Sequence, residues 1–167
     1  MESELEIRMA DTEDINTIGY LAQQIWPVTY NEILTSAQLD YMLRIFYSPD
    51  ALKEQMDKQQ QFLIAELEED PVGFASYSSV EDEGVYKIHK LYVLPELHGK
   101  GLGKALLDFI TEEIISLGAT TLRLNMNRNN PAKNFYEKNG FTIVKEEDID
   151  IGNDYFMNDY VLEKKLV

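Results

Sequence analysis

A short segment of the sequence places three glycines and two lysines immediately before a regular apolar run. Gly99, Gly101 and Gly103 alternate with other residues, a spacing that neither a helix interior nor a strand interior requires. Glycines let backbone N–H groups approach an anion, and a following helix points the positive end of its dipole at the same place. Lys100 and Lys104 add positive charge at the rim. The segment predicts either an anion-binding turn or a strand-to-helix turn whose glycines serve only the backbone.

Two well-known phosphate-binding patterns do not match this segment. A dinucleotide-binding fingerprint needs a glycine three positions after Gly101, where Lys104 stands. A Walker-type loop needs a glycine at the position of His98 and a serine or threonine at the position of Ala105. The segment is therefore not a nucleotide loop of either type.

The elements that position this turn follow from hydrophobic periodicity and from glycine and proline positions. Apolar residues at helical spacing predict a helix from Leu102 to Leu117, which Gly118 ends. Strand-like segments lie at 61–67, 72–80, 85–94, 121–127, 141–147 and 154–166, and a short helix lies at 131–139. The first two strands form a hairpin, and an acidic turn at 80–84 precedes the third.

The N-terminal third of the chain is mainly helical in its pattern. A strand at 5–10 leads to Asp11, which caps a helix that Pro27 ends. Two more helices begin after Thr35 and Ser48, the last with proline at its first position. Helices and strands together indicate a mixed α/β domain.

The composition sets bounds on the whole protein. Its 167 residues are 44% hydrophobic, which predicts a single domain over 1–167 with one sizeable core. The absence of cysteine excludes disulfides, thiolate metal ligands and thiol nucleophiles, and we expect no metal. A net charge of −15 disfavours nucleic acid and anionic membranes as partners. No membrane-spanning run or signal peptide is recognisable, so a cytoplasmic protein is expected.

Two segments carry a resemblance to a known family. The stretch "LYVLPELHGKGLGKALL" resembles the acyl-CoA pyrophosphate motif of the GNAT-type N-acetyltransferase superfamily. That motif has glutamine or arginine, two residues, glycine, one residue, then glycine or alanine; here His98, Gly101 and Gly103 hold these places. The stretch "NNPAKNFYEKNGF" resembles a second family motif, matched by Asn129, Ala132, Phe135, Tyr136, Gly140 and Phe141. Histidine at the first place departs from the usual pattern, although it can still donate a hydrogen bond to phosphate.

The resemblance implies a fold and a coenzyme site. The fold would be α/β (α+β), a mixed and mostly antiparallel sheet of about six to seven strands with a splayed central pair, flanked by about four to five helices. Acetyl-CoA would be the co-substrate, its pantetheine arm pairing with the strand edge and its pyrophosphate held by the glycine turn. The implied coenzyme-binding residues are Leu91, Tyr92, Val93, His98, Gly99, Lys100, Gly101, Leu102, Gly103, Lys104, Asn129 and Phe135. Phe135 can equally be a plain core residue.

The same resemblance implies direct acetyl transfer to a primary amine in a ternary complex. The amine attacks the thioester carbon, an oxyanion forms, and coenzyme A leaves as a thiolate. A backbone N–H of the splayed strand would stabilise the oxyanion, and we choose that of Val93. Tyr136 occupies the general-acid position and would protonate the leaving sulfur. The alternative for Tyr136 is an aromatic partner of Phe135 on a buried helix face.

The general base is not defined by the sequence. Family members often carry a glutamate on the strand before the glycine turn, but 85–93 contains no carboxylate. His89 is the group there whose ordinary pKa suits a base, and strand alternation puts it on one face with Lys87 and Leu91. A structural histidine is the alternative. The missing glutamate also leaves open a non-catalytic acyl-CoA-binding module on the same fold, whereas Tyr136 favours an enzyme.

The acceptor side is implied to lie between the N-terminal helices and the last hairpin. Trp26, Tyr30 and Tyr155 would form an aromatic wall, with Glu32 or Asp154 as anionic anchors. These aromatic residues can also be core or dimer contacts, since a homodimer is common in the family. The acidic charge leans toward a cationic acceptor, such as a polyamine, an amino acid amine or a peptide N-terminus.

Overall fold

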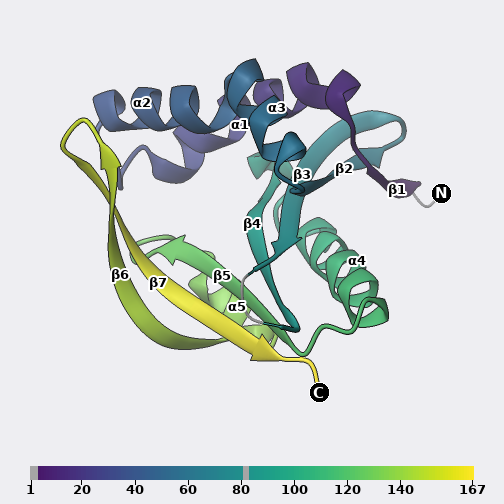
Figure 1. Cartoon of the computed structure of the whole chain (residues 1–167). Helices are drawn as coiled ribbons and strands as arrows, with labels where there is room; N and C mark the ends of the chain where they lie inside the picture. Colours follow the sequence, from purple (N-terminus) through teal and green to yellow (C-terminus); the bar gives the residue numbers. More distant parts are fainter. Residues whose placement is uncertain (1–3, 81–82) are drawn as a thin grey trace.

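The computed structural model describes residues 4–80 and 83–167, arranged as shown in Figure 1. Within the acidic turn predicted at 80–84, Glu81 and Asp82 lie outside the described residues. In the described part, seven strands form one sheet in the order β1-β2-β3-β4-β5-β7-β6. Neighbours are antiparallel except β4 and β5, which are parallel. The strands are β1 Leu5–Met9, β2 Gln61–Leu67, β3 Asp70–Ser79, β4 Val85–Val93, β5 Thr121–Asn127, β6 Thr142–Gly152 and β7 Tyr155–Lys165.

Helices cover both faces of this sheet. They are α1 Ile15–Tyr30, α2 Ser36–Tyr47, α3 Pro49–Asp57, α4 Leu102–Ser116 and α5 Lys133–Lys138. The first three lie on one side of the sheet and the last two on the other (Figure 1). The predicted mixed, mostly antiparallel sheet with flanking helices is confirmed.

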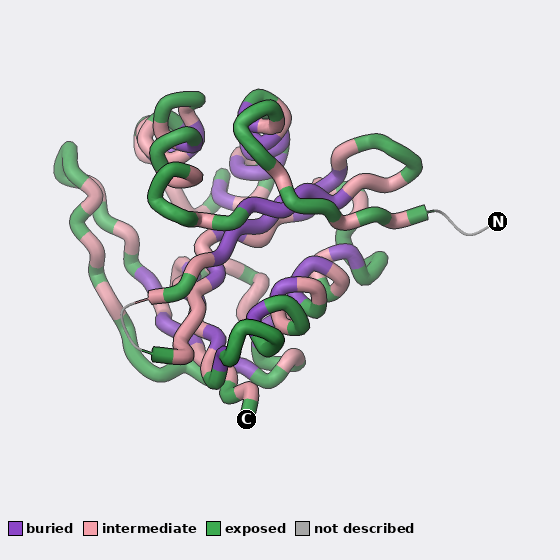
Figure 2. Tube along the Cα trace, turned by 45° about the vertical axis from the view of Figure 1, so that its right-hand side comes forward, coloured by how far each residue is buried: buried purple, intermediate pink, exposed green. Residues whose placement is uncertain are grey.

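Two hydrophobic clusters correspond to these two layers, and buried residues follow the middle of the sheet and the inner helix faces (Figure 2). The first cluster packs the inner face of α4 against β5 and its neighbours, with Leu106, Ile110, Ile114, Leu122 and Leu124 fully or nearly fully buried. The second packs α1–α3 against β2 and β3, through residues including Ile18, Ile25, Leu43, Phe62 and Phe74. The alternating inward positions of each strand supply both clusters.

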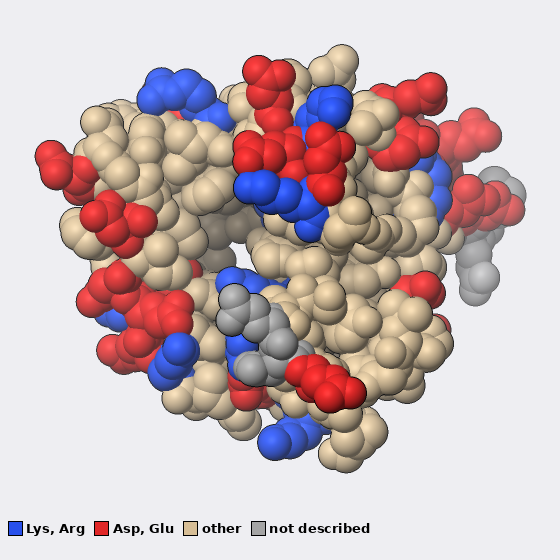
Figure 3. All heavy atoms as spheres, in the orientation of Figure 1, with Lys and Arg blue, Asp and Glu red and all other residues tan. Residues whose placement is uncertain are grey.

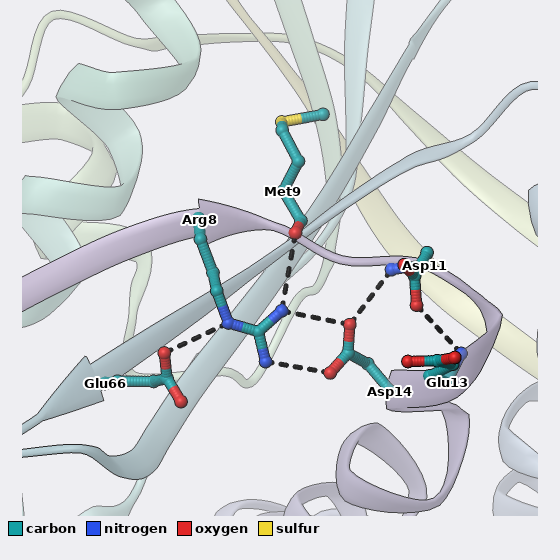
Figure 4. Close-up of polar contacts among 6 residues, drawn as sticks. All are labelled: Arg8, Met9, Asp11, Glu13, Asp14 and Glu66. Atoms are coloured by element: carbon teal, nitrogen blue, oxygen red, sulfur yellow. Dashed lines mark hydrogen bonds and ion pairs between the residues drawn. The ribbon is translucent and has the colours of Figure 1, made fainter.

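A polar network joins β1, β2 and the turn that leads into α1 (Figure 4). The Asp11 carboxylate accepts the N–H of Glu13 at 2.9 Å, and the Asp14 carboxylate accepts the N–H of Asp11 at 3.0 Å. The Arg8 guanidinium contacts Asp14 at 2.8 Å and Glu66 at 3.0 Å. The hydrogen bonds from Arg8 lower the pKa of the Asp14 carboxyl below its usual value. Asp11 thus caps this helical start, as the sequence predicts.

The prediction that Pro27 ends the first helix is wrong. α1 continues through Pro27 to Tyr30, although proline cannot donate the usual helical hydrogen bond. Trp26 and Tyr30 are both buried in the second cluster, four residues apart on one helix face, with ring centroids separated by 4.8 Å. Burial of these rings outweighs the lost hydrogen bond. The continuation carries Tyr30 to the centre of the molecule.

The final hairpin is longer than its sequence pattern indicates. β6 extends to Gly152 rather than ending near residue 147, and β7 pairs with it along its length. Asn153 and Asp154 form the turn with φ of 55° and 63°. Left-handed residues at both central positions match the twist of paired strands, so they allow a long and tightly turned hairpin.

Candidate active site

The centre of the sheet is divided where β4 and β5 separate. These strands pair over 85–88 and 121–124, after which β4 follows β3 while 125–127 follow β7. A cavity of about 660 Å³ opens at the separation, lined by residues of β4, β5, the glycine turn, α1 and α5. The predicted splayed central pair is therefore present.

A β-bulge in β4 accompanies this separation. Tyr77 pairs with Ile88 and Ser76 pairs with Lys90, so His89 is an extra residue on the β4 side. A bulge bends its strand and increases the local twist, which turns the rest of β4 away from β5.

The diverging part of β4 offers unused backbone groups to the cavity. The Leu94 N–H donates to the Val72 carbonyl on β3 at 2.9 Å. Because hydrogen bonding alternates along an antiparallel ladder, Tyr92 also bonds to β3, while the N–H and C=O of Leu91 and the N–H of Val93 point toward the cavity; the Val93 carbonyl already accepts a hydrogen bond from His98. Two residues, rather than the predicted three, therefore present backbone groups there.

The glycine turn leads directly into the N-terminus of α4. Gly99 and Gly101 have φ of +81° and +80°, a conformation that other residues adopt only with strain. The first helical hydrogen bond runs from the Ala105 N–H to the Gly101 carbonyl. The N–H groups of 102–104 precede that bond and face the turn, where the helix dipole favours an anion.

The polar side chains of this turn have contacts of their own. The His98 ring donates from Nε2 to the Val93 carbonyl at 3.0 Å, which attaches the turn to the end of β4. Lys104 forms an ion pair with Asp108 at 2.6 Å, and Lys100 is exposed. The His98 ring therefore attaches the turn to β4 through Nε2 and also lines the first cavity, where its contact with a phosphate stays a prediction.

The segment around α5 forms the opposite wall of this cavity. Phe135 lies against α4, where a Cβ added to Gly103 would meet the Phe135 ring at 3.6 Å, an ordinary contact. Asn129 is exposed and lies outside the cavity lining, whereas Asn130 lines the cavity. Asn130 Nδ2 donates to the Tyr30 hydroxyl at 3.4 Å. The asparagine of this motif that reaches the cavity is thus one residue beyond the predicted one.

Tyr136 lines this cavity from α5. Its side chain is 7% exposed and packs edge-on against Phe135 and Phe141. Burial raises the pKa of Tyr136 well above its ordinary value, so its hydroxyl keeps its proton at neutral pH. The hydroxyls of Tyr30 and Tyr92 are 3.0 Å apart. The electrostatic effect of Tyr30 further raises the pKa of Tyr136. Several tyrosines thus converge at this point.

A second cavity of about 400 Å³ lies between α1–α3 and the strands β4, β5 and β7. Figure 3 shows the surface hollowed between the helical half and the β6–β7 half of the molecule. The two cavities share part of their lining at the strand separation, namely Tyr30, Ile88, His89, Lys90, Tyr92, Asn125 and Met126. Groups that enter from opposite sides can therefore meet there.

The β6–β7 hairpin closes one side of the second cavity. The Tyr41 hydroxyl of α2 donates to the Ile151 carbonyl at 2.6 Å, and Gln38 Nε2 donates to the Phe156 carbonyl at 2.9 Å. Phe156 and Met157 line the cavity from this hairpin. The hairpin is thus attached to α2 through its main chain.

His89 faces the second cavity in a constrained environment. Its Nε2 lies 2.7 Å from Ser78 Oγ, and burial, with Lys87 and Lys90 nearby, lowers its pKa to about 4. The bulge groups it with Lys87 and Lys90, whereas Leu91 packs on the α4 side, contrary to the alternation expected from the sequence. At neutral pH the ring is uncharged and a weak base.

The residues predicted for the acceptor side fall in different places. Trp26 and Tyr30 line the second cavity. Tyr155 packs on a tyrosine of α2, outside the cavity lining, and Glu32 and Asp154 lie on the exposed surface. Glu32 and Asp154 are therefore not positioned as anionic anchors.

Two charged residues that the sequence reasoning missed line the second cavity. Asp159 on β7 is 3% exposed, and burial raises the pKa of its carboxyl. Lys90 on β4 is 8% exposed. The sequence did contain an indication of both residues. Each is a charged residue in a strand whose inward positions are otherwise mostly apolar, and a charge at such a position often has a function.

Two further features concern the described residues as a whole. Among them, no group of three or more His, Asp or Glu side chains is arranged to hold a metal ion. None of the helices in the described ranges is long and apolar enough to cross a membrane.

Comparison with known proteins identifies the family. The profile of the acetyltransferase (GNAT) family matches residues 20–141, from α1 to the start of β6. The chain belongs to the GNAT family. It is therefore an acetyltransferase that uses acetyl-CoA as co-substrate.

Individual GNAT proteins resemble the chain over most of its length. It is 29% identical to a spermidine N(1)-acetyltransferase of Thermoplasma acidophilum, over 96% of this chain and 97% of that protein. The crystal structure of PaiA N-acetyltransferase from Thermoplasma acidophilum in complex with coenzyme A has a TM-score of 0.82 and 28% identity, covering 97% of this chain and 99% of that one. A ribosomal protein bS18-alanine N-acetyltransferase of Haemophilus influenzae is 33% identical over 51% of this chain and 53% of its own length.

Proposed function

We propose that this acetyltransferase moves the acetyl group directly to a primary amine of a small molecule or peptide, with both substrates bound at once. The observation that carries the proposal is the pair of cavities that meet where β4 and β5 separate. The coenzyme enters from one side and the amine from the other. The spermidine and ribosomal-protein acetyltransferases among its relatives support an amine acceptor.

The first cavity fits the parts of acetyl-CoA. We assign the pyrophosphate to the backbone N–H groups of 99–104, because this helix N-terminus presents unpaired donors and a favourable dipole. We assign the pantetheine arm to the free backbone groups of Leu91 and the N–H of Val93. Asn130 and Phe135 would contact the arm from the α5 side.

Protonation of the leaving sulfur is assigned to Tyr136. The residue lines the first cavity and its hydroxyl keeps its proton at neutral pH, so the proton is available to donate as the carbon–sulfur bond breaks. The raised pKa itself makes the hydroxyl a weaker acid and does not favour the transfer. The Val93 N–H, which points into the separation, is the proposed oxyanion donor.

For the amine proton, Asp159 is a stronger candidate than His89. A general base is effective when its pKa lies near the working pH, and burial moves the pKa of His89 away from neutrality to about 4. Asp159 carries a carboxylate inside the second cavity, close enough to Tyr30 to affect its pKa. We propose that Asp159 binds the incoming ammonium and accepts its proton.

The test is to incubate the protein with acetyl-CoA and a panel of amines while thiol release is followed. Release with at least one amine, and initial-rate lines that intersect when both substrates are varied, are expected for a ternary complex. Parallel lines, typical of a covalent intermediate, would overturn direct transfer. Tight coenzyme binding without release from any amine would overturn amine acetylation itself.

A further inference from the structure

We propose that the second cavity selects an amine that also carries an anionic group, and that Lys90 binds this group. The inference deepens the proposed transfer to an amine and rests on it. It makes the acceptor a small zwitterion rather than a polyamine.

Lys90 is the first observation. Its side chain is 8% exposed, and its Nζ lies 5.4 Å and 5.6 Å from the ring centroids of Tyr47 and Phe62. Among residues 4–80 and 83–167, no carboxylate or other hydrogen-bonding group contacts this ammonium. Burial lowers the pKa of Lys90 to about 8, which reflects a charge that the protein itself does not balance.

A buried ammonium without a partner is unfavourable, so its position needs a reason. Lys90 lines the second cavity next to Tyr47 and within reach of bound molecules. An anion bound there would supply the missing partner and would be held in a medium of low polarity, where a charge pair is strong.

The charges of the whole cavity support the same conclusion. The described charged residues that line it are Lys87, Lys90 and Asp159, a formal net charge of +1. The complete chain carries −15, so the cavity departs in sign from the rest of the molecule. In Figure 3, basic atoms are visible at the edge of the hollow, whereas most acidic side chains lie farther out on the surface. The charges of the cavity, rather than the overall charge from which a cationic acceptor was expected, carry this inference.

The positions of these charges suit a molecule with two opposite ends. Asp159 lines only the second cavity, near Tyr30, which lines both cavities, and it takes the ammonium. Lys90 lines both cavities, but its ammonium is directed to the rings of Tyr47 and Phe62, at the end of α2 and the start of β2, and it takes the anionic group. Met42, Phe46 and Met157 supply an apolar wall for a short aliphatic linker. A polyamine would place a second ammonium against Lys90, which is repulsive.

The experiment compares amines that differ only in their second group. Diaminoalkanes, amino alcohols, amino carboxylates and aminoalkyl phosphates of two to five carbons are each offered with acetyl-CoA. We expect an anionic amine to have the highest kcat/KM and the matched diamine the lowest, at least about 10-fold apart. The carboxylate and phosphate arms identify which anion fits.

Lys90→Met tests the residue, because methionine keeps the apolar stem and removes the charge. The variant should lose the preference for the anionic amine, through a KM for that amine that rises relative to the KM for the amino alcohol. Lys53→Met is the matched control, since Lys53 is an exposed α3 residue paired with Asp57 at 3.0 Å. It changes the net charge equally and should leave the order of amines unchanged.

The outcomes separate the two proposals. Preference for the diamine at every length, or an unchanged preference in a folded Lys90→Met protein, overturns the selection but leaves amine acetylation standing. Thiol release with none of the amines overturns amine acetylation and the selection with it. If Lys90→Met does not fold, the order of amines with the native enzyme still decides.

Discussion

The two proposed halves of the active site, one for the coenzyme and one for the acceptor, are made from different parts of the polypeptide. The coenzyme half consists mainly of backbone groups, from the end of β4 and the turn before α4, within 91–104. The acceptor half consists of side chains from α1, α2, β4, β5 and β7, which are up to about 130 residues apart in the sequence. A site of backbone groups needs a local conformation, whereas a site of side chains needs the complete fold. Four substitutions test this difference between the two halves.

Tyr136→Phe should have the largest effect, because it removes the proposed proton donor for the leaving sulfur. We expect kcat to fall about 100-fold or more, with the dissociation constant of coenzyme A nearly unchanged. Thiol-release kinetics and calorimetric titration measure the two quantities. An unaltered kcat would remove Tyr136 from the mechanism and leave it as a packing residue of α5.

Gly101→Ala tests whether the coenzyme half depends on backbone conformation. Gly101 has φ of +80°, where a side chain is strained by about 1 to 2 kcal/mol, so coenzyme affinity should fall about 10-fold. Gly103→Ala is the control, since its new Cβ meets Phe135 at an ordinary 3.6 Å. Equal losses of affinity in both variants would show that volume, rather than backbone geometry, governs this half.

Asp14→Asn lies outside both halves and shows what a change in stability alone does. The pKa of Asp14 is lowered by Arg8, so its contribution is present above the unfolded pKa of about 4 and is lost as pH falls through the folded value. Because Arg8 is 44% exposed, solvent screens the pair and we expect a loss of about 1 kcal/mol at pH 7.

Urea unfolding of native protein and variant, repeated at decreasing pH, measures this difference. The difference in the free energy of unfolding between native protein and variant should become smaller as the pH falls below about 4. Kinetic constants at pH 7 should stay the same. A difference that grows in acid would contradict the direction assigned to the Asp14 pKa.

His89→Gln should have the smallest effect, although His89 lies in the acceptor half. Glutamine retains a group that can hydrogen-bond with Ser78, and a ring with a pKa of about 4 contributes little as a base, so kcat/KM should change less than about 3-fold. The pH profile of kcat/KM should keep its shape between pH 6 and 9. A loss of about 100-fold would restore His89 as the general base.

The sequence predicted the fold more completely than the site. The hairpin β2–β3 and the order β4, turn, α4, β5 followed from periodicity and glycine positions, which are local properties. The end of α1 did not, because the burial of Trp26 and Tyr30 outweighs the local effect of Pro27. The residues next to Pro27 in the sequence do not indicate that such tertiary contacts will form.

Within the site, too, features that depend on neighbouring residues were predicted, whereas features that depend on residues far apart in the sequence were not. The positive φ angles at Gly99 and Gly101 agree with a turn that only glycine favours. The bulge at His89 could not be foreseen, because it depends on the register with β3, and it changes which β4 side chains share a face. Lys90 and Asp159 were missed for the same reason: their cavity exists only once α1, α2 and the last hairpin surround it.

The attachment of the β6–β7 hairpin to α2 has an evolutionary consequence. The hairpin accepts both hydrogen bonds, from Tyr41 and Gln38, through main-chain carbonyls. Substitution at Phe156 or Met157 therefore changes the surface offered to the acceptor without removing the attachment. Gly152 is the member of this segment that must stay small, because its φ is +89° and an added Cβ would lie 2.7 Å from the Tyr41 hydroxyl. Selection can thus alter the acceptor from one lineage to another by exchanging side chains on a wall that remains in place.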